Sequence, residues 1–108
     1  MKKQYIKDKY FKARGGTAQL LDVFCMDCSS RVLIYQKDGK GRLLRCYLNR
    51  IYWPNTYDPN IKPTKNLICG KCNSAIGVPM TYSDGRYAFR LLSDAFYRRV
   101  SEEDGEYE

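Results

Sequence analysis

Two cysteine pairs constrain this chain more than any other feature of its sequence. They read CMDC at residues 25–28 and CGKC at residues 69–72, and the 108 residues contain no histidine. Two turns that each present two thiolates can complete the tetrahedral shell of a structural zinc ion. The sequence therefore predicts one structural Zn²⁺ held by Cys25, Cys28, Cys69 and Cys72.

Disulfides and a redox-active pair are the other uses of such cysteines. The first residues, MKKQYIKDKYFKARGG, have the charge of a secretory signal but not its apolar centre, and no stretch approaches ~18 apolar residues. We therefore expect a cytoplasmic protein without a membrane segment, in a compartment where disulfides are rare. A redox pair usually opens a helix in a βαβ unit, and neither pair here lies in that pattern.

Short apolar runs separated by turn signals predict a mostly β fold. Strands are expected at 19–24, 31–36, 42–53, 74–82, 86–92 and 96–100. DGKG at 38–41 predicts a hairpin in the first half, and SDGR at 83–86 predicts one in the second half. The expected architecture is two small antiparallel sheets or hairpins pinned by the zinc site, as in a zinc ribbon.

Alternation along two of these strands assigns their faces. The side expected to face the core carries Leu44, Cys46 and Leu48 in the first strand, and Tyr87, Phe89 and Leu91 in the second. A reactive thiol needs an accessible, electropositive setting. Cys46, the fifth cysteine, is therefore expected to be a buried, inert small side chain.

Charge divides the chain into three parts. Residues 1–16 are expected to form a basic arm, residues 17–100 a zinc-stapled β domain and residues 101–108 an acidic tail. Residues 1–100 carry 19 lysines and arginines against 7 aspartates, a net charge of +12, and the tail holds the other 5 acidic residues. Such a basic body favours an acidic partner.

The order of these motifs resembles a known family of zinc proteins. CMDC, LLRCYLNRI, CGKCNSAIG and DGRYAFRLL follow one another in a layout similar to that of the β-tent proteins, which include the Yippee proteins and the thalidomide-binding domain of cereblon. Gly41-Arg42 and Ile76-Gly77 look like short motifs of the Yippee proteins. The resemblance spans roughly residues 20–92 and implies a β-tent, in which zinc joins two antiparallel sheets at one apex.

Binding of nucleic acid or of a ribonucleoprotein is the function that the charge favours. Lysine and arginine neutralise phosphates, and tyrosine rings stack on unpaired bases. The candidate residues are Lys2, Lys3, Lys7, Lys9, Lys12, Arg14, Arg45 and Tyr47. The same residues could instead form an ordinary solvated basic face, because charge also serves solubility.

Two other classes of function fit parts of the sequence. Loop 53–66, with Trp53 and Tyr57 as anchors, would suit a protein-interaction adaptor, the role that the resemblance implies, although Trp53 could instead cap the core. Zinc-bearing methionine sulfoxide reductases are similar in fold, and RCYLN at 45–49 is a rearranged form of their catalytic strand. Their catalytic cysteine follows both pairs, however, whereas Cys46 lies between them, and their histidines have no counterpart.

Four thiolates leave zinc no position for water, so we expect a protein without enzymatic activity.

Overall fold

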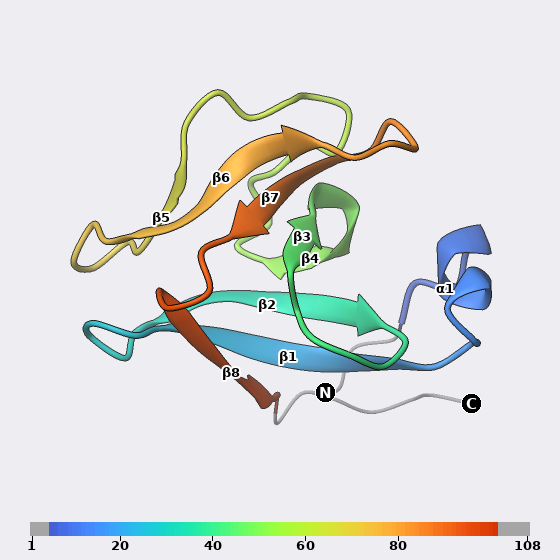
Figure 1. The fold of residues 1–108 in the computed structure, drawn as a ribbon, viewed down its shortest axis with the longest axis horizontal. Helices are drawn as coiled ribbons and strands as arrows, with labels where there is room; N and C mark the ends of the chain where they lie inside the picture. Colours follow the sequence, from blue (N-terminus) through green and yellow to red (C-terminus); the bar gives the residue numbers. More distant parts are fainter. Residues whose placement is uncertain (1–4, 102–108) are drawn as a thin grey trace.

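Two antiparallel four-stranded sheets make up most of the fold in the computed structural model, which describes residues 5–101 (Figure 1). The first sheet has the order β4-β2-β1-β8, and the second has the order β3-β7-β6-β5. The bounds in the first sheet are β1 Ala18–Cys25, β2 Arg31–Asp38, β4 Ile51–Trp53 and β8 Phe96–Val100. Those in the second are β3 Arg45–Tyr47, β5 Leu67–Ile68, β6 Ala75–Thr81 and β7 Tyr87–Leu91.

The hydrophobic core lies between the two sheets. Val23 and Leu33 from the first sheet, and Cys46, Ile76 and Phe89 from the second, are at most 1% exposed and belong to one cluster. Burying a side chain of this size contributes ~1.5–3 kcal/mol to the hydrophobic free energy of folding. The core is therefore built from the alternating inward positions of both sheets.

Most of the predicted strands are confirmed. The ranges expected at 19–24, 31–36, 74–82, 86–92 and 96–100 correspond to β1, β2, β6, β7 and β8. The SDGR turn closes the hairpin of β6 and β7, where the Tyr82 amide donates to the Arg86 carbonyl at 2.8 Å. Phe89 and Leu91 are buried as expected, whereas Tyr87 is half-buried.

The prediction of one strand over 42–53, paired with β2 in a hairpin, is wrong. This segment contains β3, a 3-10 turn η1 at Leu48–Arg50, and β4. β3 pairs with β7 in the second sheet, and only β4 returns to β2. The chain crosses between the sheets before β3, so Leu43 rather than Leu44 enters the core, and Leu44 is 53% exposed. The two halves of the chain are therefore not alike.

Residues 5–14 of the predicted basic arm are tied to the first sheet. The Gln36 side chain accepts a hydrogen bond from the Ile6 amide at 2.7 Å and donates one to the Ile6 carbonyl at 2.9 Å. Asp8 caps helix α1, Lys9–Ala13, by accepting from the Tyr10 and Phe11 amides. Lys2, Lys3 and residues 102–108 of the predicted acidic tail lie outside the described residues.

Arg50 fixes this N-terminal segment to the sheet. Its side chain is 1% exposed, and its guanidinium lies 2.6 Å from Asp8 and 3.0 Å from Asp38 at the end of β2. Such a buried cation is retained only where anions and hydrogen bonds surround it. The triad holds α1 at the end of the molecule opposite to the two cysteine turns (Figure 1).

Candidate functional site

The two cysteine turns have the same backbone geometry. In the turn between β1 and β2, the Ser29 amide donates to the Cys25 carbonyl at 2.8 Å; between β5 and β6, the Asn73 amide donates to the Cys69 carbonyl at 2.9 Å. Ser29 and Asn73 have φ angles of 62° and 64°, a left-handed conformation that closes each turn tightly. Each turn thereby directs two thiols toward the other turn.

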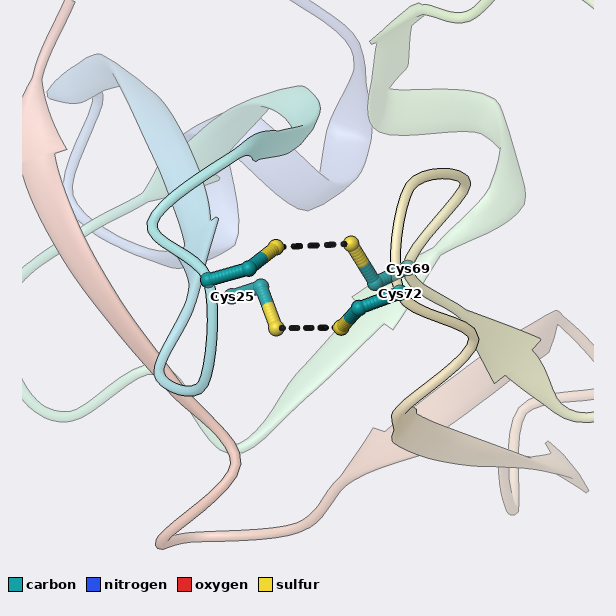
Figure 2. A group of neighbouring side chains, drawn as sticks. Cys25, Cys69 and Cys72 are labelled. Carbon is teal, nitrogen blue, oxygen red and sulfur yellow. Dashed lines mark hydrogen bonds between the residues drawn. The ribbon is translucent and has the colours of Figure 1, made fainter.

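The four sulfurs of Cys25, Cys28, Cys69 and Cys72 gather at one end of the sheets. Their Sγ atoms all lie within 4.8 Å of one another, with 3.6 Å between Cys25 and Cys72 and 3.5 Å between Cys28 and Cys69 (Figure 2). Sulfurs at ~2.3 Å from one tetrahedral ion are ~3.8 Å apart, whereas a disulfide requires ~2.05 Å. The predicted ligand set therefore fits one metal ion bound by both turns.

The cluster has a buried side and an exposed side. Cys25 and Cys69 are buried, Cys28 is half-buried and Cys72 is exposed. Hydrogen bonding with Ser30 lowers the pKa of Cys28 to about 6, and hydrogen bonding with Ser74 lowers the pKa of Cys72, whereas burial raises the pKa of Cys25 to about 11. The thiols on the exposed side are thus the more readily ionised, and a cation is needed to keep the buried side ionised.

A hydrogen bond links the two turns beside the sulfurs. The Ser74 hydroxyl donates to the Asp27 carboxylate at 2.6 Å and lies 3.2 Å from the Cys72 sulfur. We expect Ser74→Ala to lower the free energy of unfolding by ~1 kcal/mol, because this bond is lost while the carboxylate stays solvated. Urea unfolding measures the effect, with Ser83→Ala on the β6–β7 turn as the matched control. An equal loss in both variants would contradict a role for the link.

Basic and tyrosine side chains surround a cavity of about 350 Å³ near α1, at the end of the sheets opposite to the cysteines (Figure 1). We call this cavity the open-end cleft. Its basic lining residues are Arg14, Lys37, Arg42, Arg45 and Arg86, and its tyrosines are Tyr10, Tyr35, Tyr47 and Tyr82. They come from α1, β2, the segment before β3, β3 and the β6–β7 turn.

Arginine–tyrosine stacking organises one wall of the open-end cleft. The guanidinium carbon of Arg86 lies 3.6 Å from the ring centroid of Tyr10 and 3.7 Å from that of Tyr47. Arg45 lies 4.4 Å from the Tyr82 centroid and donates to the Tyr47 hydroxyl at 3.0 Å. Stacked guanidiniums keep their charge and hold it in a fixed position. Arg45 and Tyr47, which the sequence suggested as a stacking platform, therefore contact other side chains of the protein.

The other predicted nucleic-acid residues divide between the cleft and the surface. Arg14 lines the open-end cleft, whereas Lys7, Lys9 and Lys12 are exposed on and before α1. Sequence reasoning missed Lys37, Arg42, Tyr82 and Arg86 as site residues. They lie on separate segments, so no pattern in the linear sequence could have placed them in one cavity.

Trp53 and Tyr57, the anchors suggested for a protein partner, contact different sheets. Trp53 ends β4 and is 42% exposed, with the Arg31 guanidinium 4.7 Å above its ring. The Tyr57 ring packs edge-on against Phe89 of β7 at 5.4 Å. The structure therefore does not combine the two rings into one exposed aromatic patch.

Cys46 lies in the core and outside the four-cysteine cluster. It is 0% exposed, and burial raises its pKa far above the usual value. The prediction that Cys46 is a buried side chain is confirmed, and its thiol is poorly suited to act as a nucleophile.

Comparisons of this chain with protein-family models, with curated proteins and with solved structures find no match. The resemblance to the β-tent proteins therefore stays a prediction. Within residues 5–101, no helix has the length and apolar character needed to span a membrane.

Proposed function

We propose that the protein is a non-catalytic, zinc-stabilised β module that binds single-stranded nucleic acid in its open-end cleft. The proposal for the metal rests on the donor set. Four thiolates at tetrahedral spacing suit Zn²⁺, and they leave it no position at which water could be activated. The metal would then stabilise the fold, and binding would take place at the opposite end.

An excess of positive charge in the open-end cleft supports this proposal more than any other observation. Residues 5–101 contain 17 lysines and arginines against 7 aspartates. Both aspartates of the cleft are engaged, because Asp38 pairs with Arg50 and Asp84 pairs with Arg86. Within the described part of the chain, no salt bridge to an acidic side chain involves Arg14, Lys37, Arg42 or Arg45. Phosphate groups are the natural counterions for such a set.

The size of the open-end cleft favours single-stranded nucleic acid over a duplex. About 350 Å³ is the volume of a small-molecule pocket, enough for one or two nucleotides. Proteins usually read duplex DNA with a helix or β-ribbon in its major groove, which is ~12 Å wide. Helix α1 lines one side of the cleft and has 5 residues, which is too few for a helix that reads a major groove. An unpaired strand with its bases splayed therefore suits the cavity better than a duplex does.

Fluorescence anisotropy of labelled single strands of about 12 nucleotides tests this function, with a duplex of the same sequence for comparison. We expect affinity to fall roughly 50-fold between ~50 and ~200 mM salt, the loss for about four phosphate contacts to a single strand. The double variant Arg14→Gln and Arg42→Gln should weaken binding at low salt and flatten the salt dependence.

The matched control is Lys62→Gln with Lys65→Gln, which removes the same charge from exposed positions in loop 53–66. If both double variants weaken binding equally, affinity comes from net charge and not from the open-end cleft. If the zinc-loaded protein binds no strand at the lower salt, the proposed function is wrong, and loop 53–66 becomes the next surface to test with protein partners.

A further inference from the structure

Lys37 is a buried cation that lines the open-end cleft. It lies on β2 and is 7% exposed. Among the described residues its ammonium donates one hydrogen bond, to the Gly39 carbonyl at 3.0 Å, although an ammonium has three donors. The neighbouring Asp38 carboxylate is engaged by Arg50 and by the Gln36 amide. No other described residue supplies an anion to Lys37.

Two further cations lie close to this ammonium. Arg14 donates to the Lys40 carbonyl at 3.2 Å, and Arg98 donates to the Gly41 carbonyl at 3.4 Å, so both hold the turn that follows β2. Burial, together with the charges of Arg14 and Arg98, lowers the pKa of Lys37, and the charge of Asp38 offsets only part of this shift. Like charges gathered at a buried position destabilise the fold. Stability therefore does not explain this cluster, whereas an anionic ligand would.

The position of Lys37 restricts what kind of anion reaches it. Lys37 lines the open-end cleft. It also lines a neighbouring cavity of about 310 Å³, together with Lys40 and Arg98. An internal phosphate of a strand carries one negative charge and continues into the chain on both sides. A terminal phosphate carries −1.5 to −2 charges at about pH 7, presents three acceptor oxygens and has only one attachment. Such an end can enter a cavity and contact several cations at once more readily than an internal phosphate can.

We propose that Lys37, with Arg14 and Arg42, binds the terminal phosphomonoester of a nucleic-acid strand. This inference rests on the proposed function and adds the part of the strand that is recognised. Arg14 and Arg42 supply planar guanidiniums that can bind two phosphate oxygens each, and Lys37 supplies a point charge. Arg45 and Arg86, which stack on tyrosine rings, would then contact the nucleotides that follow the terminal one.

Strands that differ only at their ends test the inference. Three strands of one sequence, with a 5′-phosphate, a 3′-phosphate or two hydroxyl ends, are titrated with the zinc-loaded protein. We expect one phosphate-ended strand to bind at least about tenfold tighter than the hydroxyl-ended strand. Lys37→Met should abolish this preference, because it should weaken binding of the phosphate-ended strand more than binding of the hydroxyl-ended strand. Equal binding of all three strands by the wild-type protein overturns the phosphate site alone, whereas no binding of any strand overturns the proposed function with it.

Measurements of stability distinguish a Lys37 that binds a ligand from a Lys37 that stabilises the fold. Lys37→Met keeps most of the length of the side chain and removes its charge, so it should raise the urea midpoint of the ligand-free protein. A lower midpoint would mean that the ammonium serves the fold, and it would overturn the inference. Inorganic phosphate at about 10 mM should raise the melting temperature of the wild type but not of Lys37→Met. The same phosphate dependence in both proteins would likewise count against the site, and Lys62→Met is the matched control for both measurements.

Discussion

Replacing Cys69 by serine is expected to unfold the protein and release its metal. Cys69 is 1% exposed and supplies one of the four sulfurs. Structural zinc sites contribute on the order of 10 kcal/mol to folding, which exceeds the net stability of most domains of this size. A serine hydroxyl does not replace a thiolate, and the three remaining thiols would lose their common counterion. Circular dichroism and metal analysis by mass spectrometry should show loss of the β signal together with loss of one zinc per chain.

Cys46→Ala is the matched control, because Cys46 is also buried but lies outside the cluster. This variant should keep one zinc per chain and lose only the ~1–2 kcal/mol of a small core truncation. A chelator added to the wild type should reproduce the effect of Cys69→Ser. A Cys46→Ala protein without metal, or a folded Cys69→Ser protein with full metal content, would refute the ligand assignment.

Arg50→Met is expected to cause the second largest loss of stability. The substitution leaves Asp8 and Asp38 as two carboxylates near a buried position with no cation between them. Removing one partner of a buried ion pair typically costs ~3–5 kcal/mol. It also releases the contact that holds α1 on the first sheet. Urea unfolding should show a large drop in the midpoint, while Arg90→Met, which alters an exposed arginine on β7, should change the unfolding free energy by less than ~0.5 kcal/mol.

The pH dependence of stability gives an independent test of this triad. The hydrogen bond from Arg50 lowers the pKa of Asp8 from 3.8 to about 2. A lowered carboxyl pKa adds stability above the unfolded-state pKa, and that stability is lost as the pH falls from about 4 toward 2. The wild type should therefore lose stability over this range more steeply than Arg50→Met does. Parallel pH profiles would show that Asp8 and Arg50 do not interact in solution.

The four-cysteine cluster and most strands could be predicted because their signals are local. Cys25 and Cys28 are three positions apart in one turn, and the same spacing recurs at Cys69 and Cys72, so only two turns have to meet. The alternation of apolar residues along β1, β6 and β7 similarly reflects the geometry of a single strand. Gly and Asp at the β6–β7 turn fixed that hairpin in the same way.

Pairing of β3 was not predictable from such local signals. Residues 42–53 have the composition of one continuous strand, and a hairpin with β2 was the simplest outcome. In the structure, β3 pairs with β7 and β4 pairs with β2, and the turn between them buries Arg50. That arrangement depends on Asp8 and Asp38, which lie far from Arg50 in the sequence and near it only in the folded chain.

The sequence alone determined a four-cysteine cluster, a mostly β chain and a strong positive charge. Only the tertiary structure decided where that charge gathers. Arg14, Lys37, Arg42 and Arg86 come from segments up to 72 residues apart, and folding brings them into one cavity opposite the cysteines. Local patterns in the sequence indicate the conformation of the backbone. A binding site depends instead on which distant segments pack together, because that packing is set by the free energy of the whole chain.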